Sequence, residues 1–173
     1  MYQQYLGLLT PDEAKDIADL GQRNHSNSNF SHELVKKVAK RYQSMIDDQE
    51  FILQSPSYWR IETRPKGHEW HFDGCKLIEG KFVDNHMAWC QIGTTVLLSD
   101  PKQFTGGRIF FEKDGEPQEL KDHYLNGVCY PAGKFNNPAR HMVEPHQGKR
   151  TVLLMFFATK PVSKDQLKGK ENG

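Results

Sequence analysis

The sequence predicts an α+β fold that is mainly β, with helices confined to the first 50 residues. From Phe51 onward, short runs of β-forming residues alternate with Gly, Pro, Asp and Asn, a pattern typical of a sandwich, a jelly roll or a small barrel. At 173 residues the chain has the length of about one domain. We therefore expect a single domain in which residues 1–50 give helical support, residues 51–160 form the β core and residues 161–173 form a solvated tail.

The first helix is expected to begin after Thr10. Thr10 and Glu13 form a capping-box pattern with Pro11 at the first helical position, and an apolar stripe follows. After a polar break over residues 22–30, Ser31 is expected to cap a second helix. The apolar face of this second helix would consist of Leu34, Val35, Val38, Tyr42, Met45 and Ile46. We expect both helices to pack against a sheet.

Seven later segments have the composition of strands. In order, they are Tyr58–Thr63, Glu69–Phe72, Gln91–Leu98, Arg108–Glu112, Gly127–Tyr130, Arg140–Val143 and Arg150–Ala158. Lys76–Ala88, between the second and third of them, is either an ordinary loop or a lid over a substrate. Gly106 and Gly107 precede the fourth strand, where a tight turn or a close backbone approach would require glycine.

Composition and charge argue against several classes of partner. The formal net charge is +1, which gives no general reason to expect nucleic acid or an anionic membrane as a partner. No apolar run approaches the roughly 18 residues of a membrane span, and the N-terminus lacks the plan of a signal peptide. Cys75, Cys90 and Cys129 are odd in number and far apart, so they form neither a disulfide framework nor a C-x-x-C motif. We therefore expect a cytosolic protein, in a reducing compartment that suits ferrous iron.

Residues 69–74 contain two candidate metal ligands. His71 and Asp73 lie two positions apart on an extended segment, so their side chains point to the same face and can bind one ion. Trp70 and Phe72 then point the other way, into packing. One His and one carboxylate are two thirds of the 2-His-1-carboxylate facial triad of non-haem Fe(II) oxygenases. A third ligand has to come from elsewhere in the chain.

A second informative stretch begins at His141. Pro145, Gly148 and Arg150 follow it at fixed spacing, and Pro145 to Gly148 is expected to form a turn. The resulting hairpin would carry Arg150 back alongside His141. Simpler interpretations are also open, because Arg150 could pair with Glu144 across the turn and His141 could be a hydrogen-bonded core histidine.

The order of these motifs resembles a known family. H-x-D, then a G-G-x-x-x-F strand, then H-x-V-x-P-x-x-G-x-R is similar to the Fe(II)- and 2-oxoglutarate-dependent dioxygenases, specifically the prolyl 4-hydroxylase-like group, over about residues 55–158. The resemblance implies a double-stranded β-helix, which is a jelly-roll-like barrel. It also implies that His71, Asp73 and His141 bind Fe(II), and that Arg150 binds the far carboxylate of 2-oxoglutarate.

The implied reaction hydroxylates an unactivated C–H bond with O2, while 2-oxoglutarate is converted to succinate and CO2; ascorbate is a further candidate reductant. The residue types suit this chemistry. Three protein ligands on one face of an octahedron leave two positions for a chelating 2-oxo acid and one for dioxygen. A guanidinium such as that of Arg150 donates two parallel hydrogen bonds to a carboxylate, and so selects a dicarboxylate cosubstrate.

The chain departs from the family pattern at two places. Where many members have a Tyr two residues before an Asn, this chain has Leu97 before Ser99, and the frequent Tyr three residues before the first ligand is His68. We therefore expect another side chain to complete the 2-oxoglutarate pocket. The unranked candidates are Thr95, Tyr130 and Trp89. His68 and His146 lie an odd number of positions from the nearest expected ligands, so on regular strands they would face away.

By this resemblance the substrate is a peptidyl proline. The same chemistry on a free amino acid, another small molecule or a nucleobase is an alternative, although no basic face and no arginine pair after His141 support nucleic acid. Two further alternatives are a jelly-roll module that binds without catalysis and a cupin-like metalloenzyme that uses no oxo acid. Specificity would come from Lys76–Ala88 and Pro131–Pro138. The sequence does not predict the oligomeric state.

Overall fold

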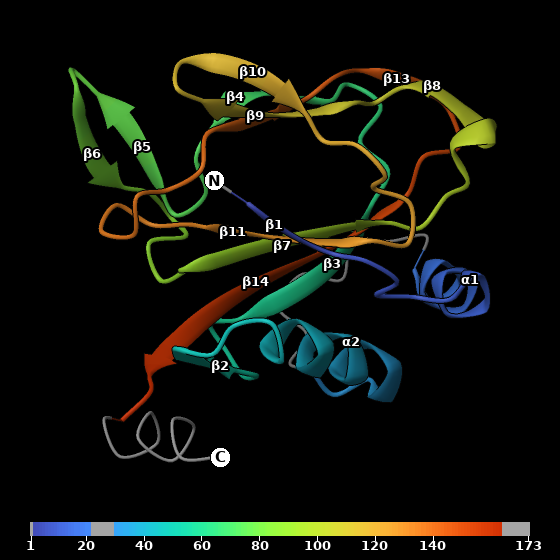
Figure 1. The fold of residues 1–173 in the computed structure, drawn as a ribbon, viewed down its shortest axis with the longest axis horizontal. Helices are drawn as coiled ribbons and strands as arrows, with labels where there is room; N and C mark the ends of the chain where they lie inside the picture. Colours follow the sequence, from blue (N-terminus) through green and yellow to red (C-terminus); the bar gives the residue numbers. More distant parts are fainter. Residues whose placement is uncertain (1, 22–29, 164–173) are drawn as a thin grey trace.

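The computed structural model describes residues 2–21 and 30–163. Within them, two antiparallel sheets face each other, and the four-stranded sheet lies above the six-stranded sheet in Figure 1. The prediction of a mainly β fold is confirmed. Most of the expected polar break (22–30) and of the expected tail (161–173) lies outside the described residues.

The larger sheet has the strand order β1-β11-β7-β14-β2, and β3 also pairs with β14. Its strands are β1 (Gln3–Tyr5), β2 (Gln49–Ile52), β3 (Tyr58–Glu62), β7 (Ile92–Leu97), β11 (Gly127–Pro131) and β14 (Val152–Pro161). Every residue of β7 is buried, because helices cover one face of this sheet and the smaller sheet covers the other. This sheet forms the floor of the interior between the two sheets.

The smaller sheet has the order β10-β9-β12-β4, and two short ladders flank it. Its strands are β4 (His68–His71), β9 (Ile109–Lys113), β10 (Glu116–Glu119) and β12 (His141–Val143). One ladder pairs β8 (Phe104–Gly106), which follows the 3₁₀ turn η1 (Pro101–Gln103), with β13 (His146–Gly148). The other is the hairpin of β5 (Cys75–Ile78) and β6 (Lys81–Asp84), which projects to one side in Figure 1.

Two helices pack on the outer face of the larger sheet, as expected (Figure 1). They are α1 (Pro11–Leu20) and α2 (Glu33–Gln43). Ile17 of α1 and Val38 of α2 are fully buried in one core cluster with Phe157 of β14. The second helix starts later than expected: its N-cap is His32, not Ser31, and that residue makes no side-chain capping bond. Neither helix is long and apolar enough to cross a membrane.

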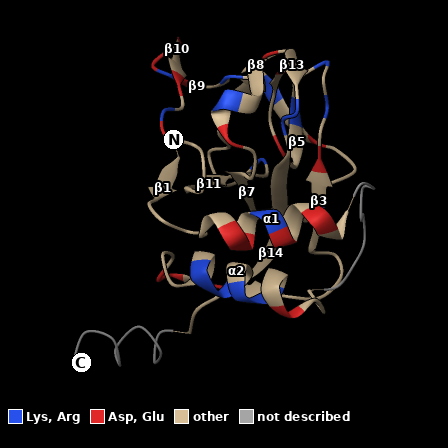
Figure 2. Cartoon of the chain, turned by 90° about the vertical axis from the view of Figure 1, so that its right-hand side faces the viewer, with Lys and Arg blue, Asp and Glu red and all other residues tan. Residues whose placement is uncertain are grey.

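The predicted capping box of α1 is present. The Thr10 hydroxyl accepts a bond from the Glu13 amide (3.1 Å), and the Glu13 carboxylate accepts one from the Thr10 amide (3.0 Å). The same carboxylate pairs with Arg41 of α2 at 2.8 Å and 3.0 Å, and Figure 2 shows acidic α1 lying beside basic α2. The Arg41 hydrogen bond lowers the pKa of Glu13 to about 2, although burial opposes it. Glu13 therefore caps one helix and joins it to the other.

Replacing Glu13 by Gln should lower the free energy of unfolding by about 0.5–1 kcal/mol at neutral pH, since the cap bond survives and only the ion pair is lost. The folded-state pKa of about 2 lies below the ordinary value of 4.5 for a glutamate, so this stabilisation is present above pH 4.5 and is lost as the pH falls toward 2. Chemical denaturation of both proteins over this range should show the two stabilities converging. A constant difference would contradict the ion-pair account.

Three expectations about the β core are corrected. Most of Lys76–Ala88 is not an ordinary loop, because it forms most of the β5–β6 hairpin; a role as a lid over a substrate stays a prediction. Residues 146–148 form strand β13 and pair with β8, so they are not a simple turn. The segments on either side of them therefore do not make a hairpin, since β12 belongs to the smaller sheet and β14 to the larger. Arg150, two residues before β14, is therefore carried toward the larger sheet and not alongside His141.

Candidate active site

The structure brings His71, Asp73 and His141 together. His71 and His141 are paired residues on the neighbouring strands β4 and β12, and Asp73 lies two residues beyond the end of β4. The His71 Nε2 atom is 3.4 Å from Asp73 Oδ1, and His141 Nε2 is 3.8 Å from Asp73 Oδ2. One ligand atom from each residue lies within 4.8 Å of the others, a spacing that could hold a single metal ion.

Backbone carbonyls orient both imidazoles. His71 Nδ1 lies 2.7 Å from the Glu69 carbonyl oxygen, and His141 Nδ1 lies 2.9 Å from that of Ala139. In each ring Nδ1 is the donor, so Nε2 is left with a lone pair that points toward Asp73. This is the arrangement in which a second partner fixes the tautomer of a metal-binding histidine.

The protonation states also fit a metal site. Burial lowers the pKa of His141 to about 4, with Asp73 opposing. Burial raises the pKa of Asp73, but His141, His71 and the hydroxyl of Tyr130 outweigh it and hold the pKa well below its usual value. A neutral imidazole and an ionised carboxylate are the forms that bind a cation.

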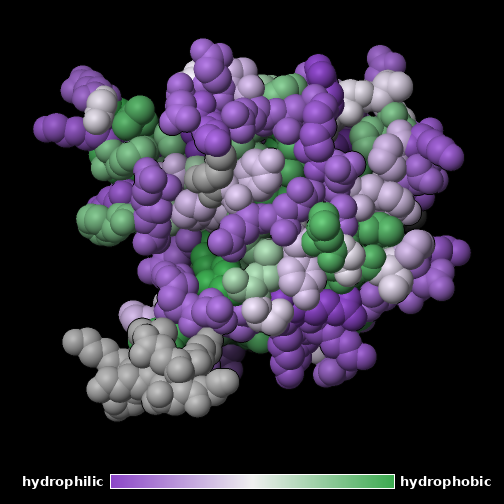
Figure 3. Space-filling view, in the orientation of Figure 1, coloured by the Kyte–Doolittle hydropathy of each residue, from purple (hydrophilic) through white to green (hydrophobic). Residues whose placement is uncertain are grey.

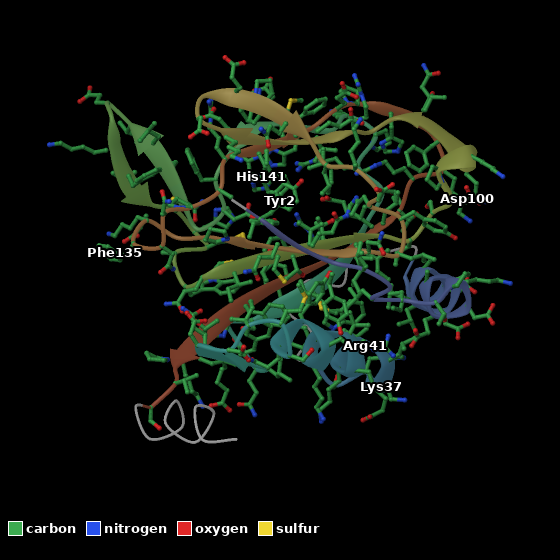
Figure 4. All side chains as sticks on the ribbon, in the orientation of Figure 1. Tyr2, Lys37, Arg41, Asp100, Phe135 and His141 are labelled. Atoms are coloured by element: carbon green, nitrogen blue, oxygen red, sulfur yellow. The ribbon has the colours of Figure 1, made fainter. Side chains whose placement is uncertain are left out.

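Aromatic side chains hold the site between the two sheets, where Figure 4 places His141. Phe111 stacks on the His141 ring with centroids 5.4 Å apart, and Tyr2 packs on Phe111 at 4.5 Å. Tyr130 donates a 2.7 Å hydrogen bond to Asp73 Oδ2. Its ring lies over Gly93, where a Cβ atom would be only 2.5 Å from the Tyr130 Cζ atom. Gly93 therefore leaves the space that this tyrosine occupies.

His68 faces the site, contrary to expectation. Its ring stacks on His71 with centroids 3.6 Å apart. The cause is a register shift: His141 pairs with His71 while Val143 pairs with His68, so three steps on β4 match two on β12. Such a bulge reverses the side to which a residue points, and the sequence carried no signal for it. Trp70 and Phe72 do point into packing, Trp70 under Arg140 and Phe72 against Phe82.

Arg150 is buried between the sheets without a partner. Arg150 is only 5% exposed. Within the described part of the chain, no residue forms a hydrogen bond or an ion pair with its guanidinium. Glu144 does not pair with it, because Glu144 binds Arg108 at 2.7 Å and 2.9 Å. Burial lowers the pKa of Arg150 to about 10, with Glu62 opposing, so the side chain is charged at neutral pH. A buried charge of this kind is costly unless an anion joins it.

The three candidates for completing an oxo-acid pocket have different surroundings. Tyr130 is already bound to Asp73. Trp89 is half-buried in a separate cluster with Tyr58. Thr95 is buried on β7, two residues from Gly93 and therefore on the same face, toward the site. Leu97 follows two residues later on that face.

Comparison with known proteins gives structural matches only. No protein-family model matches the chain, and no curated protein matches it in sequence. Among solved structures, it is similar to a viral collagen prolyl hydroxylase from Paramecium bursaria Chlorella virus-1 in complex with 2OG (TM-score 0.62, 11% identity, covering 94% of this chain and 96% of that one). It is also similar to a Pseudomonas putida prolyl-4-hydroxylase (TM-score 0.61, 13% identity, covering 94% and 87%).

These likenesses span nearly the whole of each chain, and they establish the fold. The protein folds as a jelly-roll-like double-stranded β-helix with supporting N-terminal helices. This is the fold that the resemblance of the sequence motifs predicted. Because unrelated activities share folds, the activity has to be argued from the site itself.

Proposed function

We propose that this protein is an Fe(II)- and 2-oxoglutarate-dependent dioxygenase that hydroxylates an unactivated C–H bond. The observation that carries the proposal is the combination of two features. The ligand atoms of His71, Asp73 and His141 lie within 4.8 Å of one another, and the buried Arg150, two residues before β14 of the facing sheet, has an Nε atom without a hydrogen-bond partner among the described residues. The first suits a metal with open coordination positions. The second suits the far carboxylate of a dicarboxylate.

The residues of the chain have distinct tasks in this proposal. His71, Asp73 and His141 would hold Fe(II), and the carbonyl-bound Nδ1 atoms keep both rings in the binding orientation. Arg150 would orient 2-oxoglutarate by its far carboxylate, and aromatic side chains restrict water around the ligands. The bound iron supplies the activation of O2; the overall reaction converts 2-oxoglutarate, O2 and a C–H group into succinate, CO2 and a C–OH group.

A peptide is the proposed substrate class, with a peptidyl proline as the leading target. Exposed apolar side chains gather on the β5–β6 hairpin, which begins two residues after Asp73: Leu77 is 52% exposed and Ile78 46%. Phe135, 88% exposed, lies on a neighbouring loop that an ion pair between Lys134 and Asp84 ties to the hairpin. Figure 3 shows hydrophobic atoms at this edge of a mostly hydrophilic face. Such a surface suits a partly apolar peptide.

The cellular setting is part of the proposal. All three cysteines are buried and free, as is expected in a reducing compartment such as the cytosol. That compartment would also keep iron in the ferrous state.

The proposal is tested by following succinate formation. With Fe(II), 2-oxoglutarate and O2, a library of proline-containing peptides should give succinate and a peptide that is heavier by one oxygen atom, in equal amounts. Free amino acids and nucleosides serve as the comparison set, and turnover with them instead would move the substrate to a small molecule. No 2-oxoglutarate consumption with any of them, together with no binding of Fe(II), would identify a non-catalytic module.

Gly107 should be intolerant of a side chain. It has φ +67°, and a Cβ atom there would lie 2.6 Å from Arg150 Nε and 3.2 Å from the His146 Cβ atom. Gly107→Ala should therefore displace Arg150 and weaken 2-oxoglutarate binding about tenfold or more, with Fe(II) binding unchanged. Gly115→Ala is the matched control, because it has φ +80° with nothing within 4 Å. Equal losses in the two variants, measured by calorimetry, would show that backbone strain alone is responsible.

A further inference from the structure

Three buried cationic or imidazole side chains lie at the Arg150 end of the interior. Arg150 is 5% exposed, His146 7% and His123 8%. They come from three different parts of the chain: Arg150 lies two residues before β14, His146 is the first residue of β13, and His123 lies in the segment before β11. Each has a buried nitrogen with no hydrogen-bond partner among the described residues, namely Arg150 Nε, His146 Nδ1 and His123 Nε2. Buried polar atoms rarely lack partners, so three in one region indicate a ligand.

The three side chains are close enough to influence one another. Arg150 and His146 both pack against Gly107, because a Cβ atom added to Gly107 would lie 2.6 Å from Arg150 Nε and 3.2 Å from His146 Cβ. Burial, and to a smaller extent the positive charge of Arg150, lower the pKa of His123 to about 3. The pKa of His146 is lowered by the same two causes in the same order. Both histidines are therefore neutral at neutral pH and lie within the electrostatic reach of one guanidinium.

The two histidines can play complementary roles. The backbone carbonyl of Thr95 opposes the lowering of the His123 pKa, so a ring proton directed at this carbonyl would leave the unpartnered Nε2 as an acceptor. That atom can reach a guanidinium N–H through a bridging water. His146 has its Nδ1 free, and a proton on this atom can be donated to a carboxylate. Leu97, on the neighbouring strand, replaces the hydroxyl that the family often supplies and offers no hydrogen bond.

We propose that His123 and His146 complete, with Arg150, the pocket for the far carboxylate of the oxo-acid cosubstrate. This inference rests on the proposed function. His146 would donate to the carboxylate as a binding residue. His123 would be a positioning residue that holds the guanidinium through a bridging water, because no direct hydrogen bond joins the two side chains in the structure. Neither role was found in the sequence, where His123 has no motif around it. Together they make the pocket selective for a second carboxylate.

The test compares two ligands that differ only at that end. Anaerobic calorimetry with Fe(II)-loaded protein measures the affinity for 2-oxoglutarate and for 2-oxopentanoate, which has a methyl group in place of the far carboxylate. His123→Asn keeps a donor for the Thr95 carbonyl and removes the Nε2 atom, and His146→Phe removes both ring nitrogens at similar size. His32→Asn, on an exposed helix cap, is the matched control.

Each variant should bind 2-oxoglutarate about tenfold more weakly, since roughly one hydrogen bond involving a charged group is lost. Its affinity for 2-oxopentanoate should stay unchanged, so selectivity between the two ligands falls by the same factor. Unchanged 2-oxoglutarate affinity in both variants, or an equal loss for both ligands, would overturn the inference while leaving the proposed function intact. If the wild-type protein binds neither oxo acid, the proposed function itself fails.

Discussion

Replacing Asp73 by alanine should abolish turnover and weaken Fe(II) binding by more than about 100-fold. Asp73 lies within 4 Å of both imidazole Nε2 atoms and is the only anion of the three-residue group. Loss of a residue that merely orients a ligand typically costs 10–100-fold in metal affinity, so loss of the charged ligand itself should cost more. Competition with a chromophoric chelator measures the affinity, and succinate formation measures turnover.

Asp84→Ala is the matched control for this variant. Asp84 lies on the hairpin next to the site and pairs with Lys134, but its side chain is 53% exposed and it is not part of the group. Metal affinity should therefore be unchanged in that protein. An Asp73→Ala protein that still binds one Fe(II) with wild-type affinity would show that the three side chains do not form the metal site.

Replacing Arg150 by methionine should weaken the binding of 2-oxoglutarate without lowering the stability of the ligand-free protein. Met fills a similar volume without a charge, and the affinity for 2-oxoglutarate should fall by roughly 100-fold or more, because removing one partner of a buried charge pair costs about 2–5 kcal/mol. Without any ligand, the same substitution removes a buried charge that has no partner among the described residues. The free energy of unfolding of the ligand-free protein should therefore be unchanged or higher.

Arg108→Met provides the comparison, since Arg108 is 55% exposed and pairs with Glu144. It should leave 2-oxoglutarate binding intact. Calorimetry measures 2-oxoglutarate binding, and thermal unfolding with and without the oxo acid measures stability. Together they distinguish a cosubstrate-binding role of Arg150 from a structural one. A large loss of stability in ligand-free Arg150→Met, with cosubstrate binding retained, would mean that this arginine is a structural residue.

Local patterns made much of the site predictable. His71 and Asp73 share a face because they are two positions apart, whereas His141 was assigned to the same site only by the resemblance of the motif order, and its pairing with His71 across two strands is a finding of the structure. The capping box of α1 was predictable for the same reason, since Thr10 and Glu13 interact within one turn. Features of this kind depend on spacing along the chain, which a sequence shows directly.

Long-range features were not predictable. The bulge that turns His68 toward His71 depends on how β4 and β12 pair, and no local residue marks it. The crossing from one sheet to the other between His141 and Arg150 was mistaken for a hairpin, because a Pro and a Gly are typical of both. His123 was missed because its importance comes only from the burial that it shares with Arg150.

An anaerobic titration of the protein with Fe(II) and then 2-oxoglutarate, following the weak visible charge-transfer band of an iron-bound 2-oxo acid, tests the metal site most directly. We expect the band to appear only when both are present and to saturate at one Fe(II) and one 2-oxoglutarate per chain. The band should be absent in Asp73→Ala. No band in the wild-type protein, or an equal band in the variant, would contradict the claim that His71, Asp73 and His141 share one ferrous ion.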